Sequence, residues 1–155
     1  MKKLKVYLET SIFNFVFSEK TPKERNTTLK LFDQIDRYEA YISDITIAEI
    51  DRCPEPKRGR LFDLILKYDF PELALNEAAK ELAAKYIQEG VIPQKYQVDA
   101  FHIAIASVHG MDVVISWNFE HMVKLKTKRE VVGINVFMGY TEIDIYSPWE
   151  VVENV

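Results

Sequence analysis

The sequence predicts a three-layer α/β/α sandwich with a central, mainly parallel sheet. Two observations lead to this prediction. Short apolar segments rich in β-branched residues alternate with longer segments of helical periodicity, the order in which crossover helices join parallel strands. Polar side chains also stand where apolar segments end, as Glu9 and Asn118 do. The ends of parallel strands meet at one edge of a sheet, where ligands bind in open α/β folds.

The first half of the chain is expected to alternate strands with helices. In chain order we expect a buried strand at residues 6–8, a helix at 27–38, a strand at 41–42 and a helix from Thr46 that Pro54 ends. Residues 11–20 carry aromatic side chains at every second position from Phe13 to Phe17. This alternation fits either a strand or a packed loop.

The second half continues the alternation. We expect helices at residues 61–67, 76–89 and 99–109, then a β-branched buried strand at 112–116. Residues 133–136 are expected to form the last parallel strand, and residues 143–145 alternate apolar and polar side chains. The chain shows no internal repeat, low-complexity stretch or linker of the sort that separates domains.

Length and composition limit the class of protein. With 155 residues, of which 48% are apolar, the chain is expected to form one domain over residues 1–155 with a substantial core. Cys53 is the only cysteine, which excludes an internal disulfide and a zinc site of cysteine type and suits a reducing compartment such as the cytoplasm. No apolar stretch approaches the ~20 residues of a membrane span.

The charge balance argues against a protein that binds nucleic acid by bulk charge. Lys and Arg total 20 against 24 Asp and Glu, which gives a formal net charge of -4. A nuclease stays possible, because carboxylates that bind a metal themselves lower the net charge. All five glycines are isolated, which counts against the glycine-rich loop of a nucleotide-binding site.

Three acidic residues, Glu9, Glu49 and Asp99, fall where their segments are expected to reach the same edge of the sheet. Clustered carboxylates bind hard divalent cations, and such a metal supports phosphate chemistry. Each acid also has a structural alternative. Glu9 could be a solvated strand end, Glu49 could close a capping box that begins at Thr46, and Asp99 could favourably charge a helix N-terminus. The apolar helix after Asp99 weakens the last alternative, since a buried Asp needs a partner.

The sequence offers further candidate site residues besides these acids. Asn118 could offer a neutral oxygen to a metal or hold a metal-bound water, although Asn is also a common turn residue. Ser116 precedes it at the end of the expected strand 112–116. His102 and His109 are interpreted as packing residues and left out of the site, and His121 is expected at the surface.

One basic run follows the expected strand at 112–116. It consists of Lys124, Lys126, Lys128 and Arg129. A charge run is usually a solvated face, and that is the default interpretation. Next to the edge of the sheet, the same residues could bind the phosphate backbone of RNA.

Four segments, in this order and spacing, resemble the PIN domain and in particular the toxin nucleases of VapC type. They are residues 7–11, residues 42–43 with 48–50, residues 99–104 and residues 112–119. The resemblance covers nearly the whole chain. It implies Mg²⁺ or Mn²⁺ held by acids at the sheet edge, hydrolysis of RNA and a cognate antitoxin partner. The chain departs from the family's usual pattern at Glu9, where Asp is usual, and at Asn118, where a fourth acid is usual.

Three hypotheses follow. The first is a metal-dependent ribonuclease in which Glu9, Glu49 and Asp99 bind Mg²⁺ or Mn²⁺, while Ser116 and Asn118 orient a water. The second is a non-catalytic member of the same fold that binds RNA or a protein partner. The third is an unrelated α/β enzyme acting on phosphates. The resemblance, together with the aromatic surface that Phe13, Phe15 and Phe17 would form, also predicts a homodimer.

Overall fold

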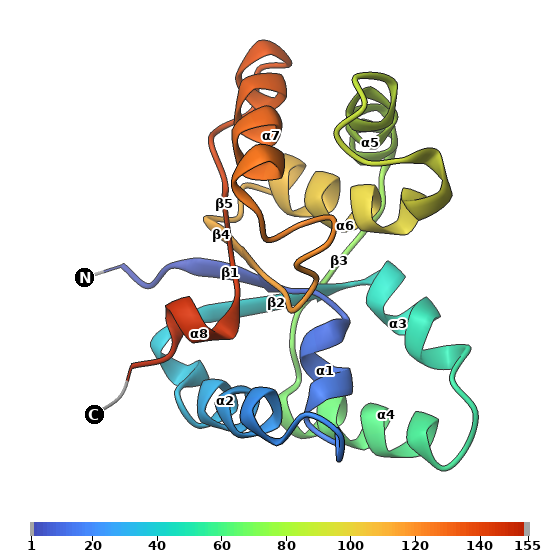
Figure 1. Ribbon diagram of the computed structural model, residues 1–155, viewed down its shortest axis with the longest axis vertical. Coiled ribbons are helices and arrows are strands. Elements are labelled where there is room, and N and C mark those ends of the chain that lie inside the picture. The colour runs from blue at the N-terminus through green and yellow to red at the C-terminus, as the bar shows by residue number, and fades with distance from the viewer. Residues whose placement is uncertain (1, 154–155) are drawn as a thin grey trace.

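The computed structural model, which describes residues 2–153, contains a five-stranded sheet in which all strands run parallel (Figure 1). The strand order is β3-β2-β1-β4-β5. The strands are β1 (Lys5–Leu8), β2 (Glu39–Ser43), β3 (Glu72–Leu73), β4 (Val113–Ile115) and β5 (Asp144–Tyr146). With helices on both faces, this arrangement confirms the predicted α/β/α sandwich.

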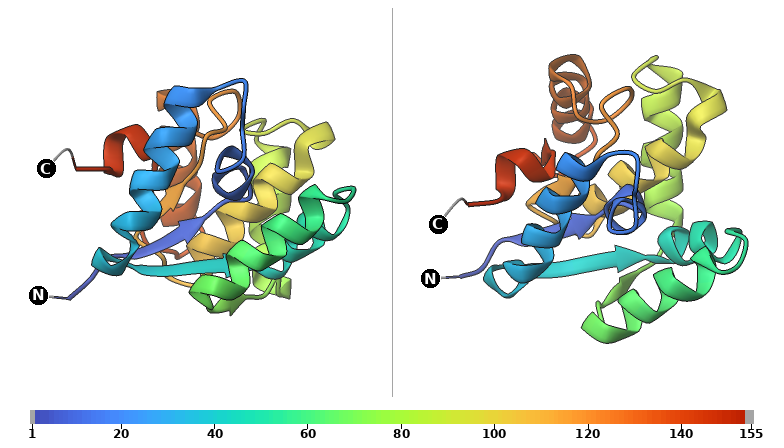
Figure 2. Two further views of the ribbon diagram at one scale, coloured as in Figure 1. Left: turned by 90° about the horizontal axis from the view of Figure 1, so that it is seen from below. Right: turned by 60° about the horizontal axis from the view of Figure 1, so that its bottom comes forward.

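Helices cover the two faces of the sheet as separate layers (Figures 1 and 2). One layer consists of α5 (Glu77–Gln88), α6 (Gln97–Val108) and α7 (Leu125–Phe137). The other consists of α1 (Ser11–Phe15), α2 (Pro22–Asp33), α4 (Lys57–Tyr68) and α8 (Pro148–Val151). The helix α3 (Asp44–Asp51) continues from the end of β2, and two short 3-10 helices cover Ile35–Arg37 and Gln94–Tyr96.

Side-chain alternation divides the core into two clusters, one on each face of the sheet. Tyr7 and its partner in the register, Val114, belong to the cluster under α5, α6 and α7. Val6 and Leu8 belong to the cluster on the other face. Because both faces are covered, β1 is apolar at successive positions from Val6 to Leu8 and β4 along its whole length, as is typical of parallel sheets.

The strands β1 and β4 form the topological switch point of the sheet. The crossover from β1 to β2 uses α1 and α2 on one face, whereas the crossover into β4 uses α5 and α6 on the other (Figure 1). Ligands bind outside the carboxyl ends of the strands at such a point. Glu9 directly follows β1 and Ser116 directly follows β4, so the fold places both residues there.

Two predicted elements are wrong. Residues 133–136 belong to α7, and the last parallel strand is β5. Asn135 lies on the buried face of this helix, where its Oδ1 accepts a hydrogen bond from the Tyr86 hydroxyl. Residues 11–15 form a helix, so Phe13 is fully buried in the core. Both errors arise because short apolar stretches fit a strand and a helix equally well.

The other expected helices and strands are present with shifted ends. The helix expected at 27–38 begins at Pro22 and ends at Asp33. The helix expected from Thr46 begins at Asp44, and Ser43 caps it by accepting a hydrogen bond from the Thr46 amide at 3.3 Å. The sequence did not predict β3 or α8. Within residues 2–153, the helices are all too short or too polar to cross a membrane.

Candidate functional site

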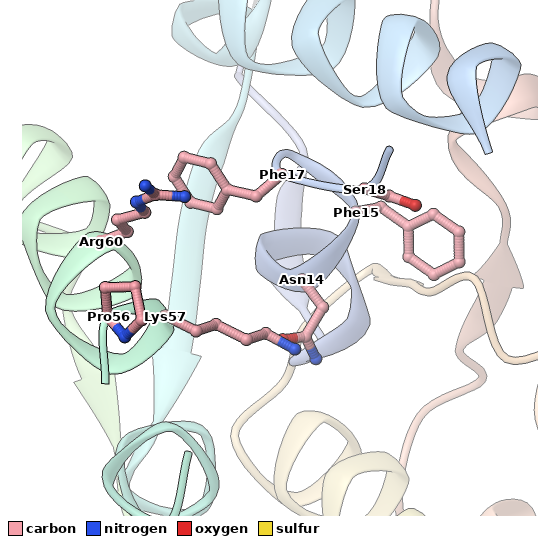
Figure 3. Close-up of a pocket in the computed structure, with 7 residues that line it drawn as sticks. All are labelled: Asn14, Phe15, Phe17, Ser18, Pro56, Lys57 and Arg60. Atoms are coloured by element: carbon pink, nitrogen blue, oxygen red, sulfur yellow. The ribbon is translucent and has the colours of Figure 1, made fainter. Parts of the chain in front are cut away.

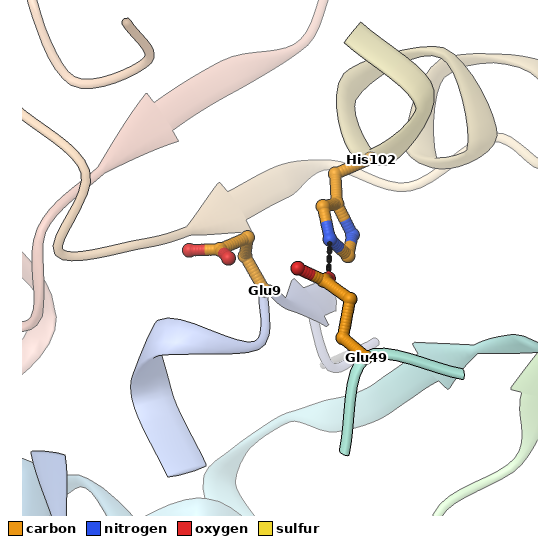
Figure 4. Close-up of side chains that lie close together, drawn as sticks. All are labelled: Glu9, Glu49 and His102. Atoms are coloured by element: carbon orange, nitrogen blue, oxygen red, sulfur yellow. Dashed lines mark hydrogen bonds and ion pairs between the residues drawn. The ribbon is translucent and has the colours of Figure 1, made fainter. Parts of the chain in front are cut away.

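Glu9, Glu49 and His102 meet at the carboxyl edge of the sheet (Figure 4). One potential ligand atom from each of the three side chains lies within 4.8 Å of the others. Glu9 comes from the end of β1, Glu49 from α3 and His102 from α6. The structure thus brings two of the predicted acids together and adds a histidine that the sequence analysis left out.

The Glu9 carboxylate is buried and held on several sides. Only 6% of the residue is exposed, so Glu9 is not a solvated strand end. It accepts hydrogen bonds from the Ser11 amide at 3.1 Å, the Ser11 hydroxyl at 2.6 Å and the Ser116 hydroxyl at 2.6 Å. These donors are all neutral. They fix the position of the carboxylate without neutralising its charge.

The Glu49 carboxylate binds two side chains from other elements. Its Oε1 accepts a hydrogen bond from the Thr10 hydroxyl at 2.6 Å and lies 2.6 Å from Nε2 of His102. The capping-box interpretation of Glu49 is therefore wrong, because Ser43 caps α3 and the glutamate points into the site.

His102 is fully buried and connects the site to the sheet. Its Nδ1 lies 2.5 Å from the Tyr7 hydroxyl, which in turn lies 2.6 Å from the Ser43 hydroxyl. Both ring nitrogens thus have partners, and the imidazole has a fixed orientation. The interpretation of His102 as a packing residue is incomplete, since the ring also contacts Glu49.

Burial and pairing act in opposite directions on the pKa values of this pair. Burial alone would lower the pKa of His102, but the hydrogen bond with Glu49 and the negative charges of Glu9, Glu49 and Asp99 raise it above its ordinary value. Burial alone would raise the pKa of Glu49, but the hydrogen bond with His102, the charge of His102 and the hydrogen bond from the Thr10 hydroxyl together lower it below its ordinary value. Both shifts favour the ion pair.

Asp99 and His121 form a second pair beside this group. Oδ2 of Asp99 lies 3.0 Å from Nδ1 of His121, whose ring packs on Tyr96 with 4.0 Å between centroids. The His121 side chain is only 11% exposed, so the expectation that it lies at the surface is wrong. Asp99 is outside the 4.8 Å group, but it lies one helical turn before His102 on α6.

Ser116 and Asn118 organise the loop between β4 and α7. The Asn118 amide donates to the Ser116 hydroxyl at 2.9 Å, and Oδ1 of Asn118 accepts from the His121 amide at 3.0 Å. Through these bonds the loop connects Glu9 at one end to the His121–Asp99 pair at the other. Asn118 therefore acts as a turn residue that also positions a side chain of the site.

The basic run lies at the start of α7. Lys124, Lys126 and Arg129 are exposed. Lys128 instead has its Nζ 5.0 Å from the ring centre of Tyr146 and 3.9 Å from Glu150.

The predicted aromatic surface is smaller than expected. Phe13 is fully buried, and Phe15 packs on Trp117 with 5.4 Å between ring centroids. Phe17 is 38% exposed, so only one of the three rings offers a substantial open face.

The residues at the carboxyl edge fit a divalent cation. Carboxylate oxygens and an imidazole nitrogen are ligands for Mn²⁺ and related metals, and carboxylates alone suit Mg²⁺. The buried Glu9 carboxylate, which has only neutral hydrogen-bond donors, supplies a negative charge that a cation would compensate.

A family model described as the PIN domain matches residues 6–121. The chain belongs to the PIN domain family. PIN domains are generally nucleases that use divalent metals. The matched range of this PIN domain contains the acids Glu9, Glu49 and Asp99, and it ends just before the basic run. A comparison with curated proteins finds none that matches the sequence.

Solved structures of toxin-antitoxin systems share the fold of this PIN domain. VapBC2 from Rickettsia felis, bound to a DNA fragment from its promoter, is 15% identical with a TM-score of 0.57, covering 93% of this chain and 98% of the other. VapBC-5 from Mycobacterium tuberculosis is 14% identical with a TM-score of 0.53, covering 92% and 98%. At these identities the likeness concerns the fold alone.

Proposed function

We propose that this PIN domain is a metal-dependent endoribonuclease and the toxin of a type II toxin-antitoxin pair. The observation that carries the proposal is the meeting of Glu9, Glu49 and His102 at the switch point, with ligand atoms within 4.8 Å of one another. Two carboxylates and a buried imidazole at this position suit a divalent cation and a phosphodiester substrate.

Glu9, Glu49 and Asp99 would hold the Mg²⁺ or Mn²⁺. A bound ion of this kind lowers the pKa of a water and stabilises charge on a phosphate. The side chains around the acids keep them in place. Ser116 holds the Glu9 carboxylate, whereas Thr10 and His102 orient Glu49.

Two kinds of observation support the proposed antitoxin partner and the proposed RNA substrate. The resemblance of the four sequence segments is to toxin nucleases, and the similar folds are described as VapBC toxin-antitoxin structures. The basic run supplies exposed cations that could bind the RNA backbone. We also propose that this PIN domain forms a homodimer.

An Asp99→Asn variant tests the nuclease. We expect cleavage of RNA in Mn²⁺ by the wild type, loss of cleavage in EDTA and loss of cleavage in the variant, with an unchanged circular dichroism spectrum. Asp33→Asn, an exposed site on α2, makes the same chemical change as a matched control and should cleave normally. Wild-type activity in Asp99→Asn would remove Asp99 from the site, and cleavage that survives EDTA would contradict the metal.

One observation favours a second candidate, a PIN domain that binds RNA or a protein partner without cleaving. The Glu49 carboxylate is already engaged by His102 and Thr10, so a metal would have to compete with these contacts. A Mn²⁺ titration by calorimetry separates the candidates. Heat of binding that is lost in Glu9→Gln supports the nuclease, whereas RNA binding without any Mn²⁺ binding or cleavage supports the second candidate.

A further inference from the structure

A hollow of about 410 Å³ separates α1 from the start of α4 (Figure 3). Asn14 and Phe15 line it from α1, Phe17 from the segment that follows, and Lys57 and Arg60 from the first turns of α4. This volume is within the range of sites that bind small organic groups.

The hollow lies on the same edge of the sheet as the acidic site. The helix α1 begins two residues after Glu9, and α4 follows α3, which carries Glu49. Figure 3 shows the first turns of α4, with Lys57 and Arg60, facing α1, with Asn14, across the hollow. A chain that passes over Glu9 and Glu49 can therefore reach the hollow without crossing the rest of the molecule.

Two cations face the hollow without an acidic partner. Within the part of the chain that the structure describes, neither the Lys57 ammonium nor the Arg60 guanidinium forms an ion pair or a hydrogen bond. The neighbouring Arg58, in contrast, is paired with Glu55 at 2.9 Å. In a protein of net charge -4, these two uncompensated charges provide a local attraction for an anion.

The polar and aromatic walls of the hollow add a second set of contacts. The Asn14 side chain points toward the end of the Lys57 side chain (Figure 3). Its Oδ1 is buried and has no hydrogen-bond donor among residues 2–153, which is unfavourable unless a ligand supplies one. Phe17, 38% exposed, offers a ring on which a base can stack.

We propose that this hollow binds a nucleotide of single-stranded RNA beside the cleaved phosphate. Lys57 and Arg60 contact backbone phosphates, Phe17 stacks on a base, and Asn14 accepts a hydrogen bond from a ribose hydroxyl or a base amino group. A phosphate alone would contact only the two cations. A nucleotide would also contact the Phe17 ring and the unpaired Oδ1 of Asn14. The inference rests on RNA being the substrate.

The test measures RNA binding separately from cleavage. Fluorescence anisotropy with a labelled oligouridylate in EDTA gives the dissociation constant over a range of salt. Single-strand binding loses ~0.7 log unit per log unit of salt for each phosphate contact, so Lys57→Ala/Arg60→Ala should reduce the slope by about 1.4. The matched control is Lys2→Ala/Lys3→Ala, which removes the same charge before β1, at the opposite edge of the sheet.

Substitution of the aromatic residue distinguishes stacking from charge. Phe17→Ala should weaken binding about fivefold or more with the salt slope unchanged. Leu66→Ala, which shortens a 76% exposed apolar side chain on α4 outside the lining of the hollow, is its control and should bind like the wild type. Thermal melting of each variant verifies that the fold is intact.

The outcomes separate this inference from the proposed nuclease. An unchanged slope in Lys57→Ala/Arg60→Ala, in a wild type that cleaves RNA, overturns the hollow as an RNA site and leaves the nuclease standing. A reduced slope in a wild type that binds RNA but does not cleave it supports the hollow and contradicts the nuclease. Binding of polyglutamate in preference to oligouridylate would identify an acidic peptide as the occupant and overturn the inference.

Discussion

Nε2 of His102 and Oε1 of Glu49 lie 2.6 Å apart, joining a fully buried imidazole on α6 to a carboxylate on α3 that is 32% exposed. The contact connects the helical layer over one face of the sheet to the helix that continues from β2. Because the site acids surround it, the protonation of this pair affects both the stability of the fold and the charge of the candidate metal site.

The first prediction is that this pair makes stability depend on pH. The pKa of His102 is raised in the folded protein. Its contribution to the free energy of unfolding is therefore full below the ordinary pKa of 6.5 and is lost as the pH rises through the pKa of the folded state. The pKa of Glu49 is lowered in the folded protein. Its contribution to the free energy of unfolding is therefore full above the ordinary pKa of 4.5 and is lost as the pH falls through the pKa of the folded state. Both contributions are therefore present together between pH 4.5 and 6.5.

Urea unfolding in EDTA, compared between the wild type and His102→Gln, measures this effect. We expect the wild type's advantage in unfolding free energy to be largest between pH 4.5 and 6.5 and to shrink on both sides. His109→Gln, a change at a more exposed histidine at the end of α6, is the matched control. A difference between wild type and His102→Gln that stays constant with pH would contradict the assigned ion pair.

The second prediction concerns the hydroxyl that holds Glu9. Ser116→Ala leaves the buried carboxylate with one donor fewer, which should lower the unfolding free energy by about 1–3 kcal/mol. Because the carboxylate loses its fixed position, we also expect weaker Mn²⁺ binding and slower RNA cleavage. Thr141→Ala, at an exposed loop position, should change neither, and normal cleavage by Ser116→Ala would show that Glu9 needs no support from β4.

Glu9 itself gives the third prediction. Glu9→Asp restores the residue usual in the family, and we expect equal or tighter Mg²⁺ binding with activity retained. Glu9→Ala removes the carboxylate and should abolish cleavage. Loss of activity in Glu9→Asp would mean that the site is adapted to the longer side chain, and full activity in Glu9→Ala would exclude Glu9 from catalysis.

The fourth prediction separates the members of the basic run. If the run binds RNA, Lys124→Ala/Lys126→Ala should reduce the salt slope of RNA binding by about 1.4, at ~0.7 per phosphate contact. Lys128→Ala should have a smaller effect, because Lys128 lies over Tyr146 and near Glu150. Cleavage at saturating RNA should hardly change in either variant, and an unchanged slope in the first would identify the run as a solvated face.

The fifth prediction concerns assembly. We expect static light scattering to give twice the mass of one chain. Phe13 cannot form the interface because it is buried, whereas Phe137 at the end of α7 is 80% exposed and adjoins Val136 at 58%. Phe137→Glu should favour the monomer, whereas Leu66→Glu, 76% exposed on α4, should not. A wild-type monomer at high micromolar concentration would contradict the dimer without affecting the nuclease.

The sequence by itself determined the fold class and the placement of the strand ends. Buried parallel strands need continuous apolar runs and their crossover helices need helical periodicity, and both are local patterns that segments such as residues 6–8 and 99–109 carry. The positions of Glu9 and Ser116 follow from the same patterns, since each comes directly after a strand. Short segments were harder, because residues 133–136 satisfy a strand pattern locally, whereas in the structure they continue α7, whose buried Asn135 accepts a hydrogen bond from Tyr86.

Only the tertiary structure decided which side chains meet. Asp99 and His102 are one helical turn apart on α6, yet the rotation of that helix against the sheet directs His102 to Glu49 and Asp99 to His121. Likewise, Glu49 contacts Thr10 because the ends of β1 and β2 are neighbours in the sheet. Such contacts depend on how rigid elements pack across long sequence separations, and no local periodicity records that packing.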